Sequence, residues 1–349
     1  MQKNIIYLSI AIMIVLSACK KGDEYKSFIP NGEKVYPGID TAITYHGGNN
    51  RGLLEWPASP DQRTSKYVVY WNNRADSIII NAASHNPKDT VKALIDNLAE
   101  GTYTFIINSF DNNGNRSVDV EKNNARVYGP IYQGNLLNRA INNVTYGLLN
   151  KLITINWRLP DAGNTVTNIT YTGSDGLGKT IKLSPDSTKL QITNWKKDTK
   201  IYYQSFYKPN ALAIDTFAVL NKDSLVVDSK SGNYMAVGSS YNYNADGSYA
   251  GVTPFNFVKQ LAIIPTSGLY VFDDVGQFAN LAKTQVFLMV NPDNTIDVSG
   301  YVSVSAPIVN HPTAGKSYYD PVTGNFVLRY KYTNTDGTVR LIEEIWSPN

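Results

Sequence analysis

The sequence predicts an all-β protein in which tandem β-sandwiches are followed by a C-terminal antiparallel β domain. Short runs of alternating apolar and polar residues begin at Val35, and turn residues interrupt them about every 8–12 positions, which is typical of sandwiches. The 24 tyrosines suit half-buried strands, and few runs favour long helices. The 349 residues exceed a single core, so we expect two or three domains of about 100–150 residues.

The first residues follow the pattern of an export signal. Lys3 precedes the apolar run Ile5 to Leu16, which at about 12 residues fits a secretory leader and is shorter than the ~20 residues that span a bilayer. Residues 17–19 read Ser-Ala-Cys and resemble a bacterial lipobox, in which the cysteine thiol takes a diacylglyceryl group. We therefore expect a lipoprotein signal peptide over residues 1–18 and lipidation at Cys19.

Cys19 is the only cysteine, so no intrachain disulfide can form, and lipidation explains a lone cysteine in an exported chain better than burial does. Residues 19–33 are expected to form a tether, too polar at its start to pack. The acidic pair Asp23 and Glu24 resembles the signal that sends Bacteroidota lipoproteins to the cell surface. This resemblance implies a lipid-anchored protein of the outer membrane that faces the cell exterior.

The charge balance argues against nucleic acid as a partner. The full chain has 32 basic and 29 acidic residues; removing residues 1–18 takes away Lys3 and no acid, which leaves 31 and 29, a net charge of +2. A nucleic-acid-binding surface needs a cluster of positive charge, and no basic run of that kind occurs.

The first sandwich is expected over residues 34–127. Two alternating runs, Arg51 to Trp56 and Tyr67 to Trp71, read as strands, with Trp56 in the core. The second run has aromatic residues on both faces, so one face must point outward. Asp111 and the two asparagines that follow at alternate positions have calcium-loop spacing, but the required glycine and glutamate are missing, which favours a plain hairpin turn.

The segment after Leu98 carries the most specific signal of this module. A turn containing Gly101 leads into a strand whose residues Tyr103, Phe105 and Ile107 share one face. The segment resembles the corner of fibronectin type III domains at which a tyrosine ties down the turn, and this resemblance implies a fibronectin type III-like or Ig-like sandwich.

The second sandwich is expected over residues 128–230, after a Gly-Pro boundary. Trp157 ends the alternating run that starts at Leu152, the place that Trp56 has in the first module, so a weak repeat of about 100 residues is expected. Residues 173–180 match the P-loop pattern letter for letter. The residues that follow alternate and stop at Pro185 rather than begin a helix, so the match is interpreted as a glycine-rich β-turn.

The C-terminal β domain is expected over residues 231–349. Its hairpin signals include Asp246-Gly247 and Asp336-Gly337, and Arg340 to Trp346 should form the last strand of a terminal hairpin. One short helix is expected near Asp273 to Lys283.

Several segments together resemble an uncharacterised lipoprotein family of Bacteroidota. They are Val35–Gly38, Tyr70–Asn73, Glu100–Tyr103 and residues 200–217, and the resemblance spans roughly Tyr25 to Asp228. Members of that family tend to be encoded in glycan-utilisation loci, beside outer-membrane transporters and lid lipoproteins. The resemblance therefore implies these partners and this pathway, and it supplies no catalytic residues.

No catalytic residues, metal site or cofactor are expected. The histidines His46, His85 and His311 are far apart in sequence and are interpreted as surface loop residues. Acidic residues occur as adjacent pairs, of which Glu343 and Glu344 are one. Neighbours on a strand point to opposite faces and cannot pair as glycosidase carboxylates do, so they are interpreted as solvated charges.

The leading hypothesis is a surface lipoprotein that binds a polysaccharide or oligosaccharide without catalysis. Binding would use aromatic rings that stack on sugars, and the candidates are Trp195, Trp71 and Trp346, for each of which core packing is an alternative of at least equal weight. The second hypothesis is a structural spacer or adhesive lipoprotein with no glycan affinity. An enzyme with an unfamiliar site is the least favoured.

Overall fold

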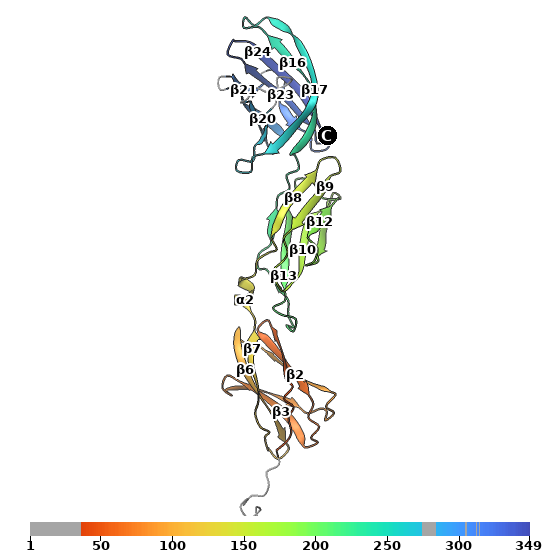
Figure 1. The fold of residues 1–349 in the computed structure, drawn as a ribbon, viewed down its shortest axis with the longest axis vertical. Coiled ribbons are helices and arrows are strands. Elements are labelled where there is room, and N and C mark those ends of the chain that lie inside the picture. The colour runs from red at the N-terminus through yellow and green to blue at the C-terminus, as the bar shows by residue number, and fades with distance from the viewer. Residues whose placement is uncertain (1–35, 274–283, 304–305, 312, 314) are drawn as a thin grey trace, which may run out of the picture. The chain divides into compact units, whose positions relative to one another are not determined.

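The computed structural model describes residues 36–273, 284–303, 306–311, 313 and 315–349. The expected signal peptide, Cys19, the tether and nearly all of the expected helix at 273–283 lie outside the described residues. Within the described part of the chain, no helix is long and apolar enough to cross a membrane. The all-β prediction is confirmed, since strands dominate and α2 (Pro130–Gly134) is a single short turn of helix (Figure 1).

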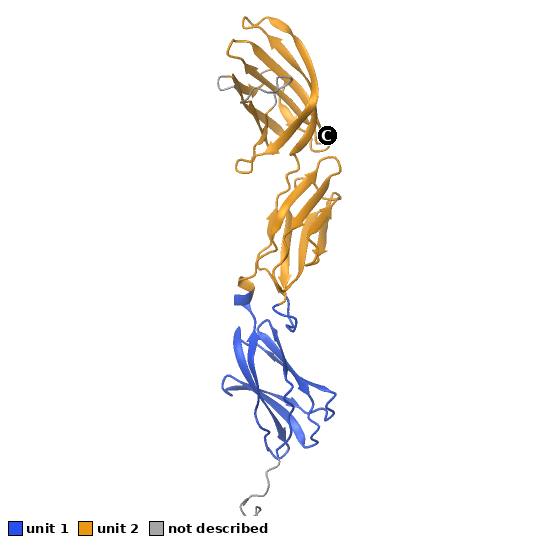
Figure 2. Ribbon diagram, in the orientation of Figure 1, with its two compact units in different colours: residues 1–132, 209–216 blue, residues 133–208, 217–349 orange. Residues whose placement is uncertain are grey.

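The chain divides into two compact units (Figure 2). Unit 1 contains the residues up to Tyr132 together with Pro209–Thr216, and unit 2 contains Gln133–Lys208 and Phe217–Asn349. The expected boundary near residue 128 thus falls close to the division. The expected boundary near residue 230 separates two sheet systems that belong to one compact unit.

Unit 1 is a sandwich of a three-stranded and a four-stranded antiparallel sheet. Trp56, Tyr67 and Phe105 are fully buried between them, which confirms the core position of Trp56. The strands are β1 (Thr44–Gly48), β2 (Arg51–Pro57) and β5 (Thr90–Asp96) in the order β1-β2-β5, and β4 (Asp76–Asn81), β3 (Thr64–Trp71), β6 (Gly101–Asp111) and β7 (Val120–Val127) in the order β4-β3-β6-β7.

The tyrosine corner is confirmed. The Tyr103 hydroxyl donates a hydrogen bond of 3.0 Å to the carbonyl oxygen of Ala99, across the turn that enters β6. The hairpin turn at Asp111 is also confirmed, because one Asp111 carboxylate oxygen accepts the backbone N–H groups of Asn113 and Asn115. That carboxylate holds the turn together, as the plain hairpin interpretation requires.

The first half of unit 2 repeats the same sandwich, which confirms tandem fibronectin type III-like modules. Trp157 is buried in the core of this sandwich, at the position on β9 that corresponds to Trp56 on β2 of unit 1. The P-loop match forms a turn that leads into a strand, as expected. The strands are β12 (Lys189–Ile192), β9 (Leu152–Trp157) and β8 (Ile141–Gly147) in one sheet, and β11 (Gly178–Leu183), β10 (Asn164–Thr172), β13 (Ile201–Tyr207), β14 (Phe217–Ala218) and β15 (Asp223–Leu225) in the other.

The C-terminal domain is a barrel-like antiparallel sheet that closes on itself, because β19 pairs with both β18 and β20. The expected terminal hairpin is confirmed as β23–β24, and Gly247 and Gly337 adopt positive φ in the hairpin turns. The strands are β16 (Gly232–Tyr243), β17 (Tyr249–Ile263), β18 (Tyr270–Phe272), β19 (Gln285–Val290), β20 (Thr295–Ser303), β21 (Ala306–Asn310), β22 (Ser317–Tyr319), β23 (Phe326–Thr333) and β24 (Val339–Pro348).

Candidate functional site

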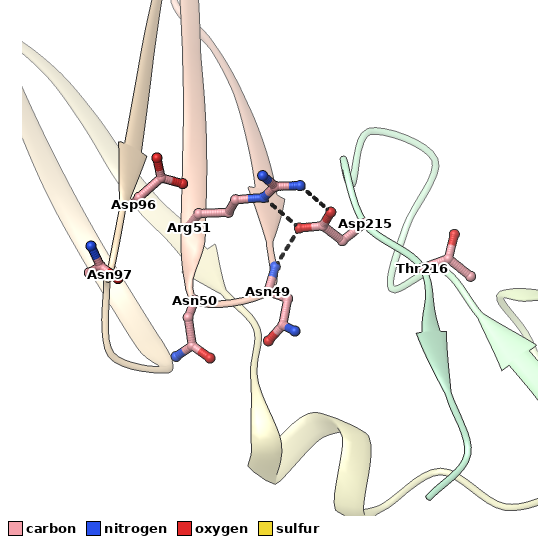
Figure 3. A pocket seen from close by; sticks show the side chains of 7 residues that line it. All are labelled: Asn49, Asn50, Arg51, Asp96, Asn97, Asp215 and Thr216. Carbon is pink, nitrogen blue, oxygen red and sulfur yellow. Dashed lines mark hydrogen bonds and ion pairs between the residues drawn. The ribbon is translucent and has the colours of Figure 1, made fainter.

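A polar hollow of about 420 Å³ lies on unit 1, and we call it the Arg51 hollow (Figure 3). Arg51 and Asp215 point toward one another and form a two-pronged ion pair, with Nε to Oδ2 at 2.9 Å and a terminal nitrogen to Oδ1 at 2.5 Å. The lining comes from the β1–β2 turn, the end of β5 and the segment Pro209–Thr216: Asn49, Asn50, Arg51, Asp96, Asn97, Asp215 and Thr216.

The segment Pro209–Thr216 is anchored on β1 by backbone contacts as well. The Ile214 N–H donates to the Gly47 carbonyl oxygen at 3.0 Å, and the Asn49 N–H donates to Asp215 at 2.7 Å. Gly48 makes this approach feasible, because a Cβ at that position would lie 2.4 Å from an Asp215 oxygen and 2.7 Å from Ile214. A side chain at position 48 would therefore displace Asp215 and Ile214 from their places against the strand.

In the Arg51 hollow, the charged groups of Arg51 and Asp215 are bonded to each other. The hydrogen bond from Arg51 lowers the pKa of Asp215 and keeps this carboxylate charged at neutral pH. None of the lining residues is aromatic, so the hollow has no ring on which a sugar could stack. We interpret the ion pair as the contact that holds the segment Pro209–Thr216 against β1 and β2.

One histidine does not lie where the sequence indicated. His46 was expected in a surface loop, but it lies on β1 with a side chain that is only 17% exposed. Its Nε2 is 3.1 Å from a Glu55 oxygen, and its Nδ1 is 2.9 Å from the Leu212 carbonyl oxygen. The segment that follows β13 covers it, and the sequence gives no sign of that contact. His85 and His311 lie outside strands, as expected.

A second polar hollow, of about 400 Å³, lies on the closed sheet, and we call it the Asp297 hollow. It forms where β21 and β22 diverge beside β20. β21 pairs with β20 from Gly300 onward, and β22 pairs only with Thr295 and Ile296. The lining residues are Asn291, Thr295, Ile296, Asp297, Asn310, His311, Gly315, Lys316 and Ser317.

Amide side chains organise the Asp297 hollow. Asn310 replaces a missing strand partner, because its Oδ1 accepts the Val298 N–H at 2.9 Å while its Nδ2 lies 3.4 Å from Asp297. Asn291 donates to the other Asp297 oxygen at 3.1 Å. The His311 Nδ1 accepts the Thr313 N–H, and burial lowers the pKa of this imidazole, so it is neutral at pH 7.

Tyrosines are exposed on the outer face of the closed sheet. Tyr249 is 58%, Tyr318 44% and Tyr301 37% exposed. Tyr318 lies directly opposite Thr295 in the β20–β22 pair, so its side chain is on the same face as Thr295 and beside the Asp297 hollow. The structure thus places an exposed ring next to a set of amide, carboxylate and hydroxyl groups.

The inside of the closed sheet contains a buried ion pair. Lys259 Nζ lies 2.6 Å from a Glu344 oxygen, both side chains are fully buried, and the Tyr330 hydroxyl donates to the other Glu344 oxygen at 2.8 Å. Glu343 and Glu344 do point to opposite faces, but the expectation that both are solvated is wrong for Glu344. Its carboxylate points inward, where a lysine from β17 compensates its charge.

Four aromatic rings surround that lysine and account for one of the candidate tryptophans. Lys259 Nζ lies 5.1–5.5 Å from the ring centres of Phe255, Phe257, Phe272 and Trp346. Trp346 itself is fully buried. The structure therefore shows Trp346 packed in the core, and its ring has no face open to a ligand.

The other two candidate tryptophans also pack inward. Trp195 is 7% exposed in the core of the second sandwich, where it contacts Tyr146 edge to face. Trp71 is half-buried against Phe105, and the outward aromatic of that strand is Tyr70, which lies under the Arg74 guanidinium. The structure thus brings none of the three tryptophans to a shared surface.

Sequence reasoning missed the Asp297 hollow and the Lys259–Glu344 pair. The residues Asn291 to Asn294 follow a hairpin-turn pattern, which does not by itself indicate a hollow beside them. Lys259 stands in an alternating strand, and its inward direction follows only from the register of β16 with β17. Among the described residues, no group of three or more His, Cys, Asp or Glu side chains could hold a metal ion.

Comparisons with known proteins give one family match and a set of similar solved structures. A family model described as a domain of unknown function, DUF4998, matches residues 19–217, which is more than half of the chain. No curated protein matches. Among solved structures, the chain is similar to the FN1–FN3 domains of chicken CNTN1, with 12% identity over 56% of this chain and 69% of that one and a TM-score of 0.29.

Proposed function

The chain belongs to the DUF4998 family, and from that premise we propose that it is a cell-surface lipoprotein that binds glycan without transforming it. The family region supplies unit 1 and most of the second sandwich, and the closed sheet follows it. In this proposal the sandwiches support the closed sheet, which makes the contact with glycan.

The exposed tyrosines of the closed sheet carry the proposal. Tyr249, Tyr301 and Tyr318 present aromatic surface to solvent while the large aromatics of the interior are buried. An exposed ring offers a flat apolar face to the C–H groups of a sugar, and its hydroxyl can bond to sugar hydroxyls. These tyrosines replace the three tryptophans as the ligand-contacting residues.

The N-terminal pattern supports the location. The match to the family begins at Cys19, which leaves the expected signal peptide outside it. We propose that Cys19 is lipidated and anchors the chain in the outer membrane, facing the exterior. The resemblance to lipoproteins of Bacteroidota glycan-utilisation loci supports an outer-membrane transporter and a lid lipoprotein as partners.

The proposal is tested on two levels. Cells that express the full chain, labelled with a fatty-acid analogue, should yield labelled protein, and external protease should degrade it in intact cells. The chain from Lys20 onward should be retarded in native gels that contain one class of polysaccharide. Retardation by none of the plant, host and microbial polysaccharides would refute glycan binding.

The second candidate function is a structural spacer or an adhesive lipoprotein without glycan affinity. One observation favours it: the three β modules each have their own buried apolar cluster, as spacer domains do. Capture of the same outer-membrane protein by the wild-type chain and by a chain lacking the exposed tyrosines, with no glycan retention, would support this alternative.

A further inference from the structure

We propose that the Asp297 hollow is the sugar-binding subsite of this chain and takes one ring of a neutral polysaccharide, an inference that rests on the proposed function. The hollow has a volume of about 400 Å³, within the ~300–1,000 Å³ typical of small-ligand sites. It exists because β21 and β22 separate beside β20.

The hydrogen-bonding groups of the hollow suit adjacent hydroxyls. The two Asp297 oxygens each accept one amide, from Asn291 and from Asn310. A carboxylate has about four acceptor positions, so each oxygen retains capacity for a ligand. Hydrogen bonds from two neighbouring sugar hydroxyls to one carboxylate are charge-assisted and stronger than neutral ones. The amides hold the carboxylate in position before the ligand arrives.

Tyr318 supplies the stacking surface at the rim. It lies opposite Thr295, whose side chain lines the hollow, and directly opposed residues in an antiparallel pair have Cβ atoms about 4.5–5.5 Å apart. Tyr318 is 44% exposed, so part of its side chain is available for contact with a ligand. A sugar ring bonded to Asp297 therefore lies within reach of the tyrosine ring.

The charge of the lining favours a neutral glycan. Asp297 and Lys316 contribute one negative and one positive charge, and His311 is neutral at pH 7, so the lining has no net charge. A polyanion such as a uronic acid polymer requires an excess of positive charge and would meet the Asp297 carboxylate directly. A neutral hexose or pentose polymer needs no excess of positive charge and is not repelled by the Asp297 carboxylate.

The test compares matched variants of the chain from Lys20 onward. Retention is measured in native gels containing xyloglucan, galactomannan, glucomannan, arabinoxylan or amylopectin, with polygalacturonate and hyaluronan as anionic probes, and the affinity for the retained polysaccharide follows by calorimetry. Tyr318→Ala and Asp297→Asn should each weaken binding about tenfold, the effect of about 1.4 kcal/mol. Tyr318→Trp should bind at least as well as wild type.

Tyr202→Ala is the matched control, because it removes a tyrosine of similar exposure (42%) from β13 of the second sandwich and should change affinity less than twofold. Unchanged thermal unfolding would show that the variants are folded. Equal binding by wild type, Tyr318→Ala and Asp297→Asn would overturn the subsite and leave the proposed function standing. Retention by anionic probes alone would overturn the neutral class, and retention neither by these probes nor by microbial polysaccharides would overturn the proposed function as well.

Discussion

Replacing Lys259 with methionine should destabilise the closed sheet severely, although methionine is apolar and four aromatic rings surround the site. Methionine fills the volume of the lysine stem and packs well against aromatic rings. The loss comes from Glu344, which would keep a buried carboxylate with the Tyr330 hydroxyl as its remaining bonded partner. Removing one member of a buried pair costs about 3–5 kcal/mol.

A second substitution should recover most of that loss. In Lys259→Met/Glu344→Gln the charge is gone, and the glutamine Oε1 still accepts the Tyr330 hydroxyl, so stability should return to within about 2 kcal/mol of wild type. The single variant should also become more stable as pH falls from 8 to 5. A buried unpaired glutamate has a raised pKa, so the folded state takes up the proton first.

Hydrogen exchange measured by mass spectrometry gives the free energy of opening strand by strand. Peptides from β16, β17 and β24 should lose protection in Lys259→Met and regain it in the double variant, while peptides from β2 and β3 of unit 1 serve as the internal control. Two results would refute the compensated-pair reasoning. One is a cost of Lys259→Met under about 1 kcal/mol, and the other is a double variant whose cost equals the sum of the costs of Lys259→Met and of Glu344→Gln measured alone.

Three further predictions concern the rest of the chain. Tyr103→Phe removes the hydrogen bond to Ala99 and should lower the unfolding free energy of unit 1 by about 1 kcal/mol in denaturant titrations, with Tyr36→Phe unchanged as the control. Asp215→Asn should cost about 1 kcal/mol at pH 7; since the pKa of Asp215 is lowered in the folded state, this contribution is present above about pH 4 and is lost as pH falls through the folded value, so wild type and variant should converge in acid denaturation. Cys19→Ala should move the chain from the detergent phase to the aqueous phase in phase partitioning of cell extracts, and an unchanged distribution would contradict lipidation.

The two sandwiches were predictable because their strands and turns are determined by residues that are close together in the sequence. The strand alternation around Trp56 and Trp157, and the corner at Tyr103, depend on residues within a few positions of one another, and all three are where the sequence placed them. The calcium-loop and P-loop patterns were interpreted correctly for the same reason. Their neighbouring residues contradicted the context that each motif needs.

Features that depend on distant contacts were not predictable. Trp346 offered an aromatic ring near a chain end, but its burial depends on Phe272 and Phe326 from other strands. Glu344 has an acidic neighbour that is partly exposed, and only pairing with β17 brings Lys259 to it. The Asp297 hollow arises from the divergence of β21 and β22, a property of the register that one sequence does not reveal.

The most direct test of glycan binding compares the wild-type chain with a variant in which Tyr249, Tyr301 and Tyr318 are all alanine. Both proteins are run in native gels containing each neutral polysaccharide, with bovine serum albumin as the unretained standard. The account predicts that at least one polysaccharide retards the wild-type chain and leaves the triple variant unretarded. Equal mobility of the two proteins in every gel would contradict it.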